Sequence, residues 1–70
     1  MDTNLFYKHV GKKLKKARIL KGLTQEELAK RTNLSADFID SLERGKEDPF
    51  IFTIFIICRE LQIPFPDVDM

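Results

Sequence analysis

A chain of 70 residues makes one small domain, close to the shortest length at which a hydrophobic core can stabilise a fold. Its composition, 43% hydrophobic and 33% charged, is typical of a folded globular domain and excludes a disordered chain, while the length excludes a deep substrate cleft. The single Cys58 excludes an internal disulfide, and no Cys/His cluster has metal-ligand spacing, so we expect no metal or other cofactor.

The charged residues are distributed very unevenly along the chain, although the net charge is only +1. Residues 1–34 contain nine Lys and Arg against three Asp and Glu, whereas residues 35–70 contain three basic and eight acidic residues. One part of such a chain suits phosphates and the other would repel them, although a merely solvated lysine-rich helix over residues 8–21 is equally consistent. The N-terminus lacks the order of a signal peptide, and the longest mainly apolar run is too short for a bilayer, so we expect a cytoplasmic protein without membrane contact.

The first predicted helix covers residues 5–21. Apolar positions recur there at helical spacing with lysines between them, and Gly22 then ends the helix as a C′ residue. The inward positions of this helix are Val10, Leu14, Ala17 and the stem of Lys21.

The second predicted helix covers residues 24–32. Thr24 and Glu27 have the spacing of a capping box, in which the two residues exchange side-chain to backbone hydrogen bonds. Leu23 and Leu28 fit the hydrophobic staple that accompanies such a cap.

The third predicted helix follows after only a few residues, over residues 35–44. Ser35 is placed to cap it, Asp37 suits the positive end of the helix dipole, and Gly45 is the C′ residue. Its apolar side consists of Phe38, Ile39 and Leu42.

The fourth predicted helix covers residues 50–61. Its many β-branched residues would also suit a strand, but a lone strand would have no partner in an otherwise helical chain. The tail after Ile63 allows one short turn of helix at most. The inward stripe of this helix is Ile51, Ile54, Ile57, Cys58 and Leu61.

Two short helices joined by a tight turn have the geometry that lays a second helix across a DNA major groove. Ala29 in the first would allow close approach, and Ile39 in the second would fill the contact. From this pattern alone, an inert helical hairpin is as consistent as a DNA-binding one.

The segment GLTQEELAKRTNLSADFIDSLERGKEDP closely resembles the phage repressor/Cro-type (XRE-like) helix-turn-helix regulators. The resemblance extends over residues 10–63 through the patterns G-L-[ST]-Q-E-x-L-A at 22–29, S-x-x-x-I-x-x-[LI]-E-x-G at 35–45 and P-x-x-x-T-x-x-x-I-[AC] at 49–58. It implies an all-α, compact four- to five-helix lambda-repressor-like domain over residues 1–70. The helix-turn-helix itself would span residues 24–45.

The resemblance also implies roles for individual residues. Gln25 would contact a phosphate and brace the third helix, although an ordinary exposed residue is the alternative. Arg18 and Glu43 would form a structural salt bridge, and Lys46 would contact phosphate unless it is simply solvated. The residues implied to face DNA are Thr24, Gln25, Ser35, Ala36, Asp37, Asp40, Ser41, Arg44 and Lys46.

The third helix departs from this family in being acidic. Readers of guanine and adenine are usually Arg, Lys, Gln or Asn, which these base-facing positions lack. Asp37 or Asp40 could accept a hydrogen bond from cytosine, and Ala36 could meet a thymine methyl group. We therefore predict modest base readout, with more affinity from Gln25, the helix N-termini and the basic first helix.

Residues 50–70 are predicted to form a dimerisation surface, because apolar side chains also lie opposite the inward stripe of the fourth helix. Contiguous exposed apolar patches usually mark interfaces. The alternative is that residues 5–7 fold over these side chains within one chain. The interface residues are Phe50, Phe52, Phe55, Ile56 and Phe65.

The resulting prediction is a transcriptional regulator, of repressor or controller type, that binds double-stranded DNA as a homodimer. A chain of 70 residues has no room for a small-molecule domain, so regulation by concentration or by a second regulatory protein is expected. The acidic third helix favours an alternative, a protein-interaction module that kept the fold without strong DNA binding. The lone His9 has no evident catalytic partner, so no enzymatic activity is expected.

Overall fold

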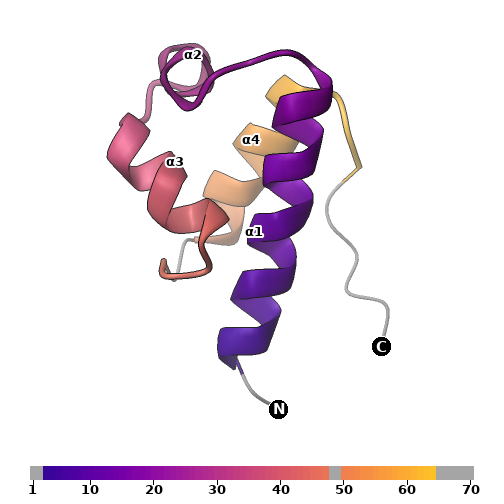
Figure 1. The fold of residues 1–70 in the computed structure, drawn as a ribbon, viewed down its shortest axis with the longest axis vertical. Coiled ribbons are helices and arrows are strands. Elements are labelled where there is room, and N and C mark those ends of the chain that lie inside the picture. Colours follow the sequence, from indigo (N-terminus) through magenta and orange to yellow (C-terminus); the bar gives the residue numbers. More distant parts are fainter. Residues whose placement is uncertain (1–2, 48–49, 65–70) are drawn as a thin grey trace.

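A computed structural model describes residues 3–47 and 50–64. This part of the chain contains four helices and no strand: α1 (Thr3–Leu20), α2 (Gln25–Thr32), α3 (Ala36–Glu43) and α4 (Ile51–Leu61), as Figure 1 shows. The all-α prediction is therefore confirmed, and α4 is a helix rather than a strand. None of these helices has both the length and the apolar character needed to span a bilayer. The predicted C-terminal turn and Phe65 lie outside the described residues.

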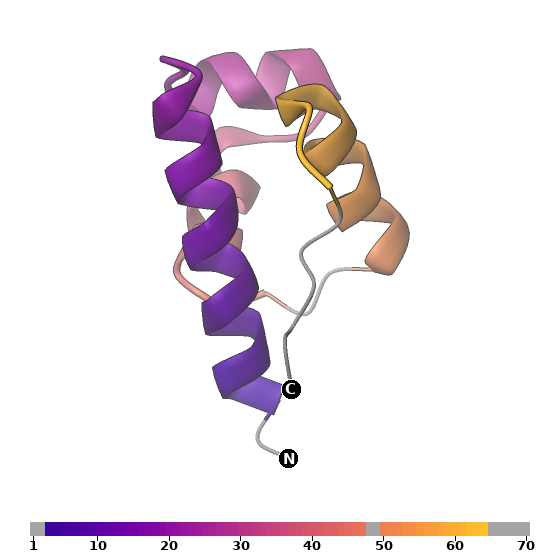
Figure 2. The ribbon, with the colours of Figure 1, turned by 90° about the vertical axis from the view of Figure 1, so that its right-hand side faces the viewer.

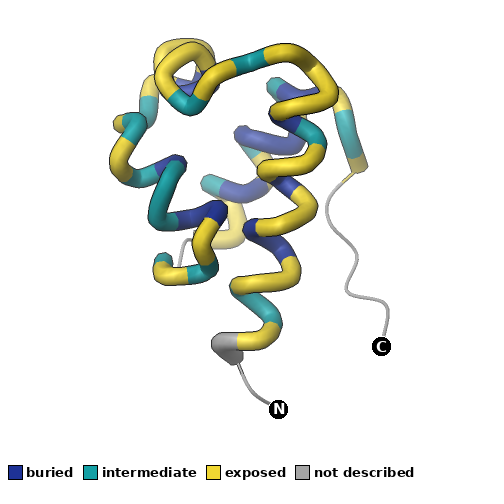
Figure 3. The backbone as a smooth tube through the Cα atoms, in the orientation of Figure 1, coloured by how far each residue is buried: buried dark blue, intermediate teal, exposed yellow. Residues whose placement is uncertain are grey.

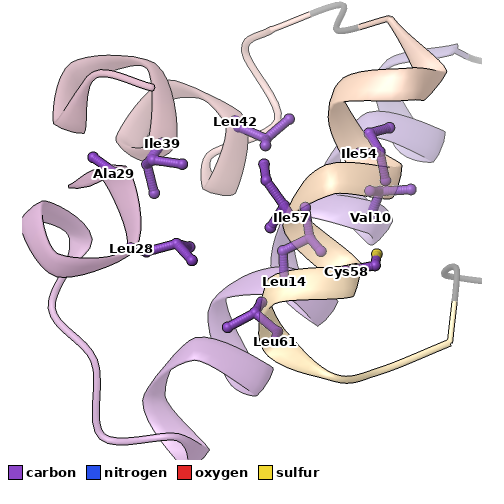
Figure 4. Close-up of a cluster of buried hydrophobic side chains, with 10 residues drawn as sticks. All are labelled: Val10, Leu14, Leu28, Ala29, Ile39, Leu42, Ile54, Ile57, Cys58 and Leu61. Carbon is purple, nitrogen blue, oxygen red and sulfur yellow. The ribbon is translucent and has the colours of Figure 1, made fainter. Parts of the chain in front are cut away.

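The four helices enclose a single core. α1 and α2 each pack against both α3 and α4. α2 lies at the level of the C-terminal ends of α1 and α4, and α3 runs from there to the middle of α1 (Figures 1 and 2). The buried apolar side chains that meet in the centre are Val10, Leu14, Leu28, Ala29, Ile39, Leu42, Ile54, Ile57, Cys58 and Leu61 (Figures 3 and 4).

Local hydrogen bonds fix where α2 and α3 begin. Thr24 Oγ1 accepts from the Glu27 backbone N–H at 3.0 Å, while Glu27 Oε1 accepts from the Thr24 backbone N–H at 2.8 Å, which confirms the predicted capping box. Ser35 Oγ accepts from the Phe38 N–H at 3.0 Å and caps α3. Both caps satisfy backbone donors that the first turn of a helix leaves without partners.

Left-handed residues then end α1 and α3 and make the turn between α2 and α3. Gly22 and Gly45 have φ of 73° and 74°, as expected for C′ residues. Asn33 has φ of 61° at the C-cap of α2. The reversal between α2 and α3 therefore takes only a few residues, which is what the helix-turn-helix requires.

Two predicted inward positions are wrong. Ile51 is 70% exposed, because it is the first residue of α4 and the neighbouring helices do not cover that turn. Lys21 is exposed and follows the end of α1, where its Nζ donates to Gln62 Oε1 at 2.8 Å. The last inward side chain of α1 is instead Arg18, which is buried although charged.

Candidate nucleic-acid interface

A buried ion pair connects α1 to α3. Arg18 Nε lies 2.6 Å from Glu43 Oε2, and Arg18 Nη2 donates to Glu43 Oε1 at 3.1 Å, so the pair is bidentate. Arg18 Nη1 also donates to the Leu23 carbonyl at 2.7 Å, in the loop before α2. The hydrogen bond with Glu43 raises the pKa of Arg18. The ion pair expected from the resemblance is present, and it ties three segments together.

Gln25 connects the start of α2 to α3. Its Nε2 donates to Asp40 Oδ1 at 3.1 Å and to Glu43 Oε1 at 3.0 Å. A carboxylate can only accept, so the amide nitrogen must face this pair and uses both of its hydrogens there. Gln25 braces α3 in this way, and its side chain keeps only an acceptor oxygen for other groups. A phosphate would then meet the backbone N–H groups at the start of α2 rather than the amide.

Asp40 is held on both sides. Its Oδ1 accepts from Gln25, and its Oδ2 lies 3.3 Å from Arg44 Nη1, one helical turn further along α3. The hydrogen bond from Gln25, and then the one from Arg44, lower the pKa of Asp40. Both carboxylate oxygens therefore already have donors, which leaves Asp40 less available to cytosine than the sequence suggested.

The remaining predicted DNA-facing residues divide into two groups. Ser35 is exposed, but its hydroxyl caps α3, and Ala36 is half-buried against the core. Ser41 is also half-buried. Thr24 is exposed like Ser35, and its hydroxyl caps α2, whereas Asp37, Arg44 and Lys46 are exposed without a capping role.

Two glycines bring α1 close to the end of α3. A Cβ on Gly11 would collide with the Leu42 carbonyl oxygen and lie 2.7 Å from that of Glu43. A Cβ on Gly45 would lie 2.7 Å from Lys8 Cα. The sequence reasoning assigned Gly45 only to helix termination and missed Gly11, whose available signal was a lone glycine inside a helical pattern.

A different surface, at the first turn of α4, is apolar. Phe50, Phe52 and Phe55 are 83%, 67% and 51% exposed, whereas Ile56 is half-buried. Residues 5–7 do not cover them: Leu5 is itself 64% exposed. The single-chain alternative is therefore not found among the described residues.

Similar proteins share this architecture. An HTH-type transcriptional regulator of Sinorhizobium fredii is 38% identical over 56 residues, which cover 80% of this chain and 73% of the relative. One of Methanocaldococcus jannaschii is 39% identical over 56 residues, covering 80% and 85%. The restriction-modification controller protein C.AhdI from Aeromonas hydrophila superposes with a TM-score of 0.85 at 28% identity, covering 91% of this chain and 93% of C.AhdI.

A larger protein contains the same domain. An HTH_3 family transcriptional regulator from Vibrio cholerae superposes with a TM-score of 0.84 at 28% identity, and the match covers 91% of this chain but only 36% of that one. Residues 14–68 of the present chain match the helix-turn-helix family HTH_3. The chain thus belongs to the HTH_3 family, the Cro/C1-type (XRE-like) helix-turn-helix transcriptional regulators.

Proposed function

We propose that this chain binds specific double-stranded DNA sequences as a transcriptional regulator, with α3 in the major groove. The observation that carries the proposal is the network of Arg18, Gln25, Asp40 and Glu43, which fixes α3 relative to α1 and α2. A recognition helix held in this way is preorganised, so DNA binding does not include the free-energy cost of ordering it.

The proposed contacts separate into positioning and reading. The backbone N–H groups at the start of α2, with Arg44 and Lys46, would bind phosphates and set the register on the duplex. Thr24, Ser35, Ser41 and Ala36 would approach the groove beside them. Asp37 is the exposed carboxylate of α3, and it would accept from a cytosine N4 amino group.

A homodimer would read two half-sites about one helical turn apart. We assign the interface to a second copy of the chain packing on Phe50, Phe52, Phe55, Ile56 and Phe65. The support is the high exposure of the first three in the single chain. A two-fold interface is self-complementary, so one apolar patch suffices to cover its copy.

Selection of bound sequences from a random duplex DNA pool, followed by titration of the best sequence over a salt series, tests the proposal. We expect a two-fold motif with half-site centres about 10 base pairs apart and an affinity that falls steeply with salt. A pool without enrichment and without salt-dependent binding would reject DNA regulation. It would favour the alternative of a protein-interaction module, which the acidic α3 also suits.

Mobility-shift titrations of Asp37→Ala and Asp40→Ala test the reading roles. Asp37→Ala is expected to relax preference at one base pair, by about 1–3 kcal/mol for a lost direct contact. Asp40→Ala is expected to weaken all sequences alike, because Asp40 holds Gln25 and Arg44. An unchanged base preference in both variants would remove any reading role for the two aspartates.

A further inference from the structure

We propose that the surface for DNA backbone phosphates extends over the crossing of α1 and the end of α3. It consists of Lys8 and Lys15 on α1 with Arg44 and Lys46 at the end of α3, and we name these four residues the crossing cluster. The inference rests on the proposed function. It goes further by assigning two lysines of α1 to DNA contact and excluding two others.

The close approach of the two helices creates the crossing cluster. Gly11 sits against the carbonyl oxygens of Leu42 and Glu43, and Gly45 sits against the backbone of Lys8. Any larger side chain at either glycine would push the helices apart. Figure 1 shows the end of α3 meeting α1 near its middle.

Helical spacing decides which lysines of α1 belong to this junction. Residues three or four apart share a helix face, so Lys8 and Lys15 lie on the same side as Gly11. The positive charge of Lys15 also contributes to lowering the pKa of Asp40 on α3, consistent with this placement. Lys13 and Lys16 lie on a different side of α1 and are exposed there.

The cations of the crossing cluster are poorly neutralised. Lys8, Lys15 and Lys46 are exposed, and none of them forms an ion pair with another described residue. Arg44 alone has a partner, Asp40. Exposed cations without an ion-pair partner attract anions, and duplex DNA supplies a row of them.

The spacing of the two lysines is larger than the spacing of neighbouring phosphates on a DNA strand. Seven residues separate Lys8 from Lys15, a rise of about 10 Å along α1, and each strand of DNA carries a phosphate about every 3.4 Å along its axis. The two side chains can therefore bind different phosphates of one strand. Through Asp40, Arg44 lies next to Gln25, so the tract would continue to the start of α2.

Titration of the selected DNA sequence over a salt series, with two double variants of equal charge, tests this surface. Lys8→Ala/Lys15→Ala removes the α1 half of the crossing cluster, and Lys13→Ala/Lys16→Ala is its matched control. Loss of two phosphate contacts is expected to make the salt slope shallower by about 2 and to weaken binding at 0.1 M salt by about 10- to 100-fold. The control is expected to change affinity by less than about threefold, since only long-range charge is lost.

Circular dichroism melting of both variants checks that the lysines act on DNA rather than on folding. A Lys8→Gln/Lys15→Gln variant, which keeps a long polar side chain and removes only the charge, should reproduce the alanine result. Equal losses in the crossing and control variants, with wild-type binding intact, would overturn this inference alone. A wild-type chain without salt-dependent DNA binding would overturn both this inference and the proposed function.

Discussion

Two surfaces of this domain differ in whether their side chains find partners within a single chain. Around α2 and α3, three polar side chains at the helix starts have partners within the chain: Thr24 with Glu27, Ser35 with the start of α3, and Gln25 with Asp40. At the start of α4, by contrast, Phe50, Phe52 and Phe55 are largely exposed, and the other described residues leave them so.

This difference separates interactions that form when one chain folds from contacts that require a second chain. Hydrogen bonds inside the chain form at any protein concentration, so the orientation of α3 should not depend on dimerisation. Exposed aromatic side chains stabilise the protein only when another surface buries them, so this stabilisation depends on protein concentration. Substitutions on the two surfaces should consequently respond to different measurements.

The largest effect is expected from Glu43→Ala. Removing this carboxylate leaves the guanidinium of Arg18 buried without its charged partner, which costs about 3–5 kcal/mol of unfolding free energy. Urea unfolding followed by circular dichroism measures the loss. Because the variant can fail to fold, Arg18→Met/Glu43→Leu is the companion: with both charges replaced by apolar groups, it should regain most of the stability. A double variant as unstable as Glu43→Ala would contradict this account.

Phe52→Ser/Phe55→Ser is expected to act on association instead. Loss of two aromatic anchors should raise the dimer dissociation constant by about 100-fold, on the order of 3 kcal/mol, and leave the helical spectrum unchanged. Sedimentation at micromolar concentration measures the shift from dimer to monomer. Leu20→Ser is the control, since Leu20 is 77% exposed at the other end of the fold. A wild-type chain that sediments only as a monomer would contradict the assignment of the exposed phenylalanines to a dimer interface.

Sequence patterns predicted the features that neighbouring residues determine. The capping box of Thr24 and Glu27, the Ser35 cap and the glycines at 22 and 45 each act over a few residues, so short patterns reveal them. The core positions of α2 and α3 follow from helical spacing for the same reason. The pairing of Arg18 with Glu43 is long-range, and only the family resemblance indicated it.

What the sequence did not predict depends on packing between distant segments. Ile51 fits the periodicity of α4, but its exposure depends on where the neighbouring helices end. The family resemblance implies that Asp40 reads bases, whereas its partners in the structure are Gln25 of α2 and Arg44, the C-cap of α3. Gly11 is needed because α3 ends against α1; a lone glycine inside a helical pattern marks the position as special but does not identify its partner.

Gly11→Ala tests how closely α1 packs against α3, and Gly22→Ala is the matched control substitution. The new methyl group at residue 11 would meet backbone carbonyls of α3, which cannot move aside easily, so we expect a loss of about 1–3 kcal/mol. Gly22 has open space around it, so Ala at this position meets only the cost of a left-handed φ. We expect it to lower the free energy of unfolding by about 1 kcal/mol. Thermal unfolding measures both. A smaller loss at Gly11 than at Gly22 would mean that α1 does not press on α3 as described.

The smallest effect concerns pH. Hydrogen bonds from Thr24 lower the pKa of Glu27 below its ordinary 4.5, and those from Gln25 and Arg44 lower the pKa of Asp40 below its ordinary 3.8. The folded state therefore binds these protons less readily than the unfolded chain, and the stabilisation is complete above about pH 5. It decreases as the pH falls through 4.5 and 3.8 toward the lower values of the folded state.

Thermal midpoints between pH 7 and pH 3 measure this dependence. Glu27→Gln and Asp40→Asn should each flatten the acid limb of the curve. The midpoints of wild type and variants should converge at low pH, where the wild-type carboxyl group is protonated and, like the amide of the variant, uncharged. The apolar surface of α4 has no titrating group among its phenylalanines, so Phe52→Ser/Phe55→Ser should keep the wild-type acid limb. A phenylalanine variant with a flattened limb would show that the two surfaces are coupled, and the separation between folding and association would then not hold.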